Sequence, residues 1–107
     1  MGYLKKEFII IELFIEKEVE QVKKLISKIK PKYYQKLFLM VEHICNGGYS
    51  LFISWDGSKE GWDTSNEFDE IRNNFIEDIK KLKYIIIWYV CDDEHLEVPY
   101  VKRIDED

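Results

Sequence analysis

The chain has 107 residues, of which 46% are hydrophobic and 15% aromatic, and this composition fits one folded domain and excludes a disordered chain. Its formal net charge of −5 argues against general binding to nucleic acids or anionic membranes, because both depend on an excess of lysine and arginine. The same charge permits an acidic surface that meets a basic partner. We therefore expect a single domain over residues 1–107, ending in a short acidic tail at about 104–107.

The cysteines and the N-terminal segment indicate a cellular compartment. Cys45 and Cys91 are too few and too far apart for a disulfide framework, which favours a reducing environment. The apolar run that follows Lys5 and Lys6 is broken by Glu12, and it has neither a small-residue cleavage site nor the length to span a membrane. These features predict a cytoplasmic location with no membrane contact.

The first part of the chain predicts a strand, a helix and an ambiguous segment. Residues 8–15 (FIIIELFI) read as a central strand, and residues 16–30 as a helix that Pro31 ends. Residues 33–45 fit either a helix stripe or a strand. We favour the strand, because the Asn46-Gly47 pair that follows is typical of a tight hairpin turn and the next segment can pair with it.

The second part predicts a strand, a helix and one or two further strands. Apolar and smaller residues alternate from Tyr49 to Trp55, as in a strand. Thr64 and Glu67 form a capping-box pattern, and helical spacing of apolar residues then continues to Leu82. Residues 84–90 (YIIIWYV) predict a buried strand and residues 98–104 an edge strand, where Pro99 is tolerated.

These elements follow the order β-α-β-β-α-β, with a further C-terminal edge strand as an option. This order predicts a ferredoxin-like α+β fold, a two-layer sandwich with two helices on one face of an antiparallel sheet. No linker, repeat or low-complexity segment divides the chain.

The polar loop at 56–67 (DGSKEGWDTSNE) is one candidate metal site. Its oxygen-bearing residues fall at the spacing of an EF-hand calcium loop, with Gly61 at the sixth position where a sharp bend is needed. A strand rather than a helix enters the loop, and Asp63 stands where an apolar residue is usual. The alternative interpretation is a polar loop followed by a helix cap. The calcium hypothesis names Asp56, Ser58, Glu60, Thr64 and Glu67 as ligands.

The same loop is also a candidate protein-contact site. Tryptophan is enriched at interfaces because it offers a large rigid surface, and this loop has two. The contact hypothesis names Trp55, Lys59, Glu60, Trp62 and Asp63.

Histidine and cysteine pairs give weaker candidates. His43 with Cys45, and Cys91 with His95, have neither zinc-finger nor CxxC spacing, so structural roles are the better interpretation. A nucleophilic Cys91 would need His95 held beside it. We find no phosphate-binding loop, dinucleotide fingerprint or serine triad.

The block from NGGY through FISWDGSKEGWDTSNEFDEIR to CDDE resembles a group of small bacterial and phage-borne proteins that share an NGG-strand-DGSKEGW arrangement. The resemblance covers roughly the C-terminal two thirds of the chain, and Cys91 stands where that group would have glycine. It implies a phage or mobile-element setting rather than a mechanism.

The sequence thus predicts a small, acidic, non-enzymatic protein-binding domain with no resident cofactor. Alternatives are a calcium-binding domain and a small-ligand enzyme on a ferredoxin-like sheet, the latter resting on fold analogy alone. A homodimer formed through a sheet face is a further option.

Overall fold

A computed structural model describes residues 4–105 and gives an α+β fold. The chain forms β1 (Lys5–Leu13), α1 (Glu16–Ser27), the short 3-10 helix η1 (Lys32–Leu37), β2 (Phe38–Glu42), β3 (Tyr49–Ile53), α2 (Asp63–Ile79), β4 (Ile85–Asp93) and β5 (Tyr100–Arg103). The predicted α+β class and the additional C-terminal strand are confirmed.

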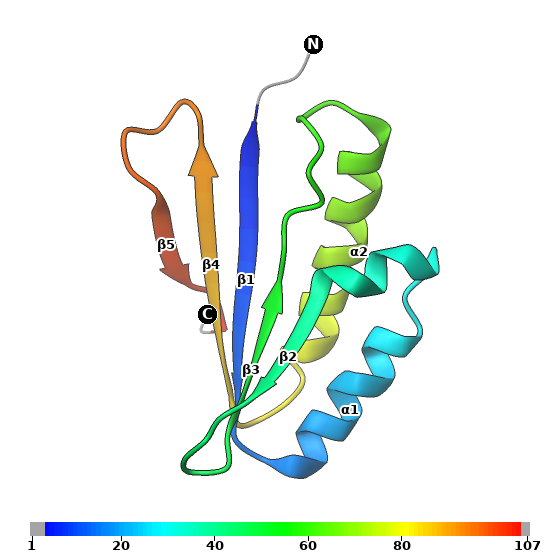
Figure 1. Ribbon diagram of the computed structural model, residues 1–107, viewed down its shortest axis with the longest axis vertical. Helices are drawn as coiled ribbons and strands as arrows, with labels where there is room; N and C mark the ends of the chain where they lie inside the picture. Colours follow the sequence, from blue (N-terminus) through cyan, green and yellow to red (C-terminus); the bar gives the residue numbers. More distant parts are fainter. Residues whose placement is uncertain (1–3, 106–107) are drawn as a thin grey trace.

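The five strands form one antiparallel sheet in the order β2-β3-β1-β4-β5 (Figure 1). The longest pairing joins β1 to β4 over nine residues, from Lys5 opposite Asp93 to Leu13 opposite Ile85. The sheet is thus built around β1, which has a neighbour on each side, while β2 and β5 are its edges.

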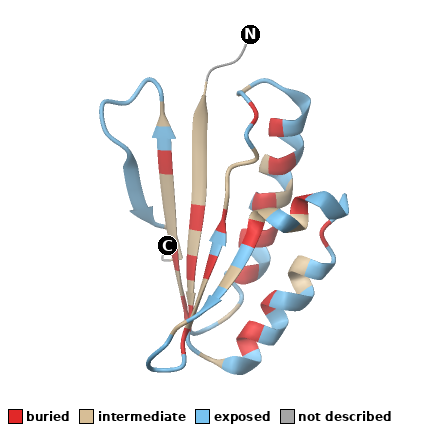
Figure 2. Cartoon of the chain, viewed as in Figure 1, coloured by how far each residue is buried: buried red, intermediate tan, exposed pale blue. Residues whose placement is uncertain are grey.

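The core lies on one face of the sheet only. Ile9, Ile11 and Leu13 of β1 are fully buried and alternate with half-buried residues, as the period of two in a strand requires. They pack with apolar residues from both helices, among them Val22 of α1 and Phe68 of α2. The buried residues therefore lie where the strands and the helices face each other (Figure 2).

Within the segment 33–45, only Phe38–Glu42 is a strand. Residues 32–37 form η1, and β2 follows at once from Phe38. Tyr34 explains the difference, because it is 4% exposed and stacks on Phe68 of α2 at 5.3 Å between ring centroids, a contact that turns this part of the chain toward the helix layer.

The hairpin turn is confirmed, since Asn46 and Gly47 both have positive φ values, 67° and 66°. The predicted N-cap is wrong. The helix α2 begins at Asp63, one residue before Thr64, and its N-cap is Trp62, which makes no side-chain capping bond.

Several other boundaries also differ from those predicted, among them that of the first strand, which was expected at 8–15 and lies at Lys5–Leu13. The helix α1 ends at Ser27 rather than at residue 30, and β4 continues past its predicted end at residue 90 to Asp93. Asp105, predicted to lie in an acidic tail, accepts hydrogen bonds from the backbone N–H of Ile87 and from Arg103. These bonds lower the pKa of Asp105, with the Arg103 bond as the largest cause. Of that tail, residues 106–107 lie outside the described part of the chain.

Candidate functional site

The loop between β3 and α2, residues 54–62, is folded around Ser58. The Asp56 carboxylate accepts hydrogen bonds from the backbone N–H of Ser58 at 3.1 Å and from its hydroxyl at 2.8 Å. The indole N–H of Trp55 donates to the Ser58 carbonyl at 3.0 Å. Gly57 and Gly61 have φ values of 92° and 91°, which favour glycine. The loop therefore has a defined shape of its own.

A pocket of about 340 Å³ lies between this loop and η1. We call it the loop pocket, and its lining residues are Tyr33, Tyr34, Lys36, Leu37, Asp56, Gly57, Ser58, Trp62 and Thr64. Two of its aromatic side chains remain accessible, since Trp62 is 51% and Tyr33 is 58% exposed. The pocket thus joins the predicted loop to aromatic residues that precede it by more than twenty positions.

Tyr34 has a buried hydroxyl with no hydrogen-bond partner among the described residues. Burial, followed by the neighbouring Tyr33 and Glu67 side chains, raises the pKa of Tyr34 above its ordinary value. The phenol therefore stays neutral at physiological pH. Because its ring contacts Tyr33 in a tilted arrangement and stacks on Phe68, Tyr34 anchors the pocket to the core.

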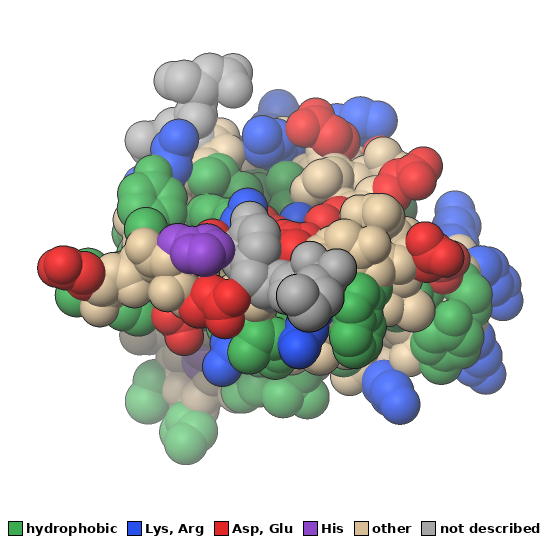
Figure 3. Space-filling view, turned by 90° about the horizontal axis from the view of Figure 1, so that it is seen from above, with side chains coloured by type: hydrophobic (Ala, Val, Ile, Leu, Met, Phe, Trp, Pro, Cys, Tyr) green, Lys and Arg blue, Asp and Glu red, His purple; other side chains and the backbone are tan. Residues whose placement is uncertain are grey.

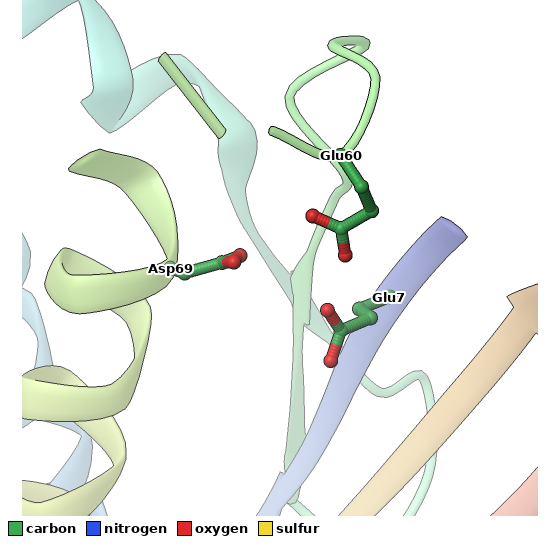
Figure 4. Close-up of side chains that lie close together, drawn as sticks. All are labelled: Glu7, Glu60 and Asp69. Atoms are coloured by element: carbon green, nitrogen blue, oxygen red, sulfur yellow. The ribbon is translucent and has the colours of Figure 1, made fainter. Parts of the chain in front are cut away.

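Three carboxylates converge at the same end of the molecule. Glu7 of β1, Glu60 of the loop and Asp69 of α2 each place an oxygen within 4.8 Å of the others (Figure 4). In the described part of the chain, this is the only group of three or more acidic, histidine or cysteine side chains placed so closely. Viewed from above, acidic and basic side chains lie next to one another at this end (Figure 3).

Arg72 neutralises part of this cluster from within. Its guanidinium lies 3.3 Å from Asp69 and 3.5 Å from Glu7, and its side chain is only 7% exposed. Tyr89 donates to Glu7 at 2.6 Å, and Ser65 donates to Glu60 at 3.1 Å. Burial raises the pKa of Asp69; Arg72 opposes that shift, and Glu7 and Glu60 add to it. The cluster is therefore an internally paired network.

The residues of the calcium hypothesis are divided among three places. Asp56 is bonded to Ser58, and both line the loop pocket with Thr64. Glu60 points instead to Glu7 and Asp69, as Figure 4 shows. Glu67 is exposed on α2 near Tyr34.

The residues of the contact hypothesis fall into two kinds. Lys59, Trp62 and Asp63 are exposed, whereas Trp55 and Glu60 are half-buried and hold the loop in place through hydrogen bonds. Lys6 of β1 also lies over the Trp55 ring, 5.5 Å from its centroid. The exposed members are therefore the ones available to a partner.

The members of each histidine and cysteine pair lie in different surroundings. His43 bonds the Ser50 hydroxyl at 2.6 Å, Cys45 is exposed and Cys91 is buried in β4. His95 lies in the exposed turn after β4, and its backbone N–H donates to Asp93.

Sequence reasoning missed Glu7, Asp69, Arg72 and Tyr33 as parts of these sites. Two signals were present. Glu7 lies in phase with Ile9 and Ile11 on the buried side of its strand, and Arg72 falls four residues after Phe68 in the apolar stripe of α2. A charged residue in phase with a buried stripe needs a partner, which indicates an internal ion pair.

Comparisons with protein-family models, with curated proteins and with solved structures gave no match. The resemblance to small bacterial and phage-borne proteins therefore stays a prediction. Within residues 4–105, no helix has both the length and the apolar character needed to cross a membrane.

Proposed function

We propose that this chain is a small, acidic, non-enzymatic domain that binds another protein through the loop pocket. The observation that carries the proposal is the pair Trp62 and Tyr33, two aromatic side chains more than half exposed beside a preformed pocket of about 340 Å³. Exposed aromatic residues around a pocket are typical of the few positions that supply most of the energy of a protein interface.

The charge near the pocket favours a basic segment of the partner. Asp63, Glu67 and Glu70 are exposed in the first turns of α2, next to Trp62. A partner side chain with an apolar stem and a positive end, such as arginine or lysine, would place its stem between the aromatic rings and its charge near these carboxylates.

We also propose that the fold is ferredoxin-like with one added edge strand. The element order β-α-β-β-α-β and the strand order β2-β3-β1-β4 support this assignment. The fold does not select a function, so the proposal rests on the pocket.

The test compares three immobilised proteins, the wild type, Trp62→Ala and Tyr84→Ala, in affinity capture from cell lysate with quantitative mass spectrometry. Tyr84 is also 58% exposed but does not line the loop pocket, so it is a matched control. We expect a protein that the wild type and Tyr84→Ala both capture. Trp62→Ala should bind it about ten-fold or more weakly, a loss of about 1.4 kcal/mol or more. Most interface residues cost less than that when they are truncated to alanine.

The charge argument adds a second readout. Capture should weaken when the ionic strength is raised from about 0.05 to 0.5 M, because salt screens exposed charges. Equal capture by the three proteins, with equal thermal melts, would contradict the proposal.

A further inference from the structure

The face of the sheet opposite the helices is apolar and uncovered in the described chain. Strand register places Phe8 beside Val90, Ile10 beside both Trp88 and Phe52, and Phe52 beside Leu39. Phe8 and Phe52 stack with their centroids 5.7 Å apart. At the two edges, Leu39 is 58% and Val101 is 59% exposed. We call this surface the open face.

The open face is large enough for a specific interface of modest affinity. Five strands about 4.8 Å apart that average about 6.4 residues of about 3.3 Å each span roughly 24 by 21 Å, or about 500 Å² in the plane of the sheet. Two such faces in contact would bury roughly 1,000 Å², the lower limit of specific interfaces. Contiguous apolar surfaces of this size on a soluble domain mark interaction sites.

The charges on the open face are arranged so that the face complements itself. On β1, Lys6 lies at one end and Glu12 at the other, and Phe8 and Ile10 lie between them on the same side. Two open faces meet when the two-fold axis lies in the plane between them. If this axis also runs perpendicular to β1, Lys6 of each copy lies opposite Glu12 of the other. An axis parallel to β1 would instead oppose lysine to lysine and glutamate to glutamate.

The Glu12 and Lys6 side chains are held in position within each copy, before two copies meet. Glu12 accepts a hydrogen bond from the Trp88 indole at 2.8 Å, and Lys6 lies over the Trp55 ring. On the neighbouring strands, Asp92 of β4 lies beside Lys6, and Arg103 of β5 lies beside Trp88. Charges that are already ordered lose little conformational freedom on association.

We propose that two copies of this chain associate through their open faces, about a two-fold axis perpendicular to β1 that brings Lys6 of each copy opposite Glu12 of the other. This surface lies on the opposite side of the sheet from α2 and is separate from the loop pocket, so the inference is independent of the proposed function.

The first experiment measures mass in solution by light scattering and sedimentation over a concentration series that reaches about 500 µM, because a modest interface dissociates in the micromolar range. We expect a concentration-dependent rise toward twice 13.0 kDa. The edge variant Leu39→Lys should remain monomeric, whereas Ile44→Lys, at a fully exposed position in the β2–β3 turn, should dimerise like the wild type.

Exchanging the charges at positions 6 and 12 tests the direction of the two-fold axis. Lys6→Glu and Glu12→Lys should each weaken association by about ten-fold or more, because each opposes like charges. The double variant Lys6→Glu/Glu12→Lys restores opposite charges only with the perpendicular axis, so it should recover most of the wild-type affinity. Thermal melts of all the variants verify that each is folded.

Three outcomes would overturn the proposal. A monomeric wild type throughout the series would exclude self-association. If that monomer binds another protein saturably, and Leu39→Lys abolishes the binding, the open face is the binding site of that protein instead. A dimer without rescue in the double variant would exclude the proposed axis.

Discussion

At the scale of single residues, Arg72 has the largest structural role that the sequence did not predict. Its guanidinium pairs with Glu7 and Asp69, which lie close to Glu60, and this network links β1, the loop and α2. Buried charges therefore lie where the loop, β1 and α2 meet. An ion pair of this kind contributes little net stability when intact, but losing one partner leaves a buried charge uncompensated.

Replacing Arg72 with Met should lower the free energy of unfolding at pH 7 by about 3–5 kcal/mol, the usual cost of breaking a buried pair. The variant keeps much of the side-chain volume and removes the charge and the hydrogen-bond donors of the guanidinium. Chemical denaturation with urea measures the difference. Lys80→Met is the matched control, because Lys80 forms an exposed pair with Glu77 at 3.9 Å and its loss should cost less than about 1 kcal/mol.

The same variant should be less destabilised in acid. The pKa of Asp69 is already raised by burial, and Arg72 is the neighbour that lowers it, so the variant raises it further above the unfolded value. The ionised form then costs stability above the folded-state pKa, and the cost disappears below the unfolded-state pKa. The gap between variant and wild type should therefore narrow from pH 7 to about pH 4. A gap that is constant with pH would assign the loss to packing instead.

At the scale of elements, the β2–β3 hairpin is fixed by close packing as well as by its turn. A Cβ atom at Gly48 would lie 2.9 Å from Nδ1 of His43 and 3.2 Å from the backbone oxygen of Leu13. The His43 ring is itself bonded to Ser50, and the Leu13 oxygen belongs to the central strand.

Gly48→Ala should therefore lower the free energy of unfolding by about 1–3 kcal/mol, as overpacking does in a rigid site. The measurement is a thermal or urea denaturation curve. In a His43→Ala background, only the contact with Leu13 remains, so the cost should fall in a double-mutant cycle. An unchanged cost would place the strain on the backbone oxygen alone.

Most elements could be predicted because each has a local pattern. The alternation from Tyr49 to Ile53 and the helical spacing of Phe68, Phe75 and Ile79 reflect which faces are buried. The 3-10 helix could not be predicted, because it depends on Tyr34 meeting Phe68 across 34 positions of sequence. The N-cap prediction was wrong for a related reason. The Ser65 hydroxyl donates to Glu60, so the loop rather than Thr64 sets the first turn of α2.

At the scale of the whole molecule, the candidate site combines segments that local patterns treat separately. The loop was identifiable from its dense polar and aromatic residues. Its partners, Tyr33 on one side and Glu7 on the other, were not, because the sheet and the helix layer bring them together only in the folded chain. For the same reason, an EF-hand spacing along the sequence did not predict where Glu60 points.

Thermal melts in calcium, in magnesium and in chelator should have the same midpoint. We expect no metal-dependent shift, because Asp56, Glu60 and Glu67 lie in different places and do not form one ligand set. In addition, Arg72 already neutralises part of the acidic cluster. A ligand at 100 times its Kd would add about 2.7 kcal/mol. For a domain of this size, that is a rise of at least several degrees, at about 4–8 °C per kcal/mol.

A calcium-specific rise would contradict this expectation, and two variants would locate the ion. Loss of the rise in Glu60→Gln but not in Glu67→Gln would place the ion at the cluster with Glu7 and Asp69. Loss in both variants would restore the EF-hand interpretation of the loop.

The two cysteines differ in accessibility, and this difference decides how the protein must be handled. Cys45 is exposed in the β2–β3 turn, whereas Cys91 is buried in β4. In an oxidising buffer, the Cys45 thiolates of two copies can form a disulfide. The product would be a covalent dimer of doubled mass that does not involve the open face. The same exposure makes Cys45 a single-site handle for a maleimide dye, while Cys91 stays protected for as long as the sheet is folded.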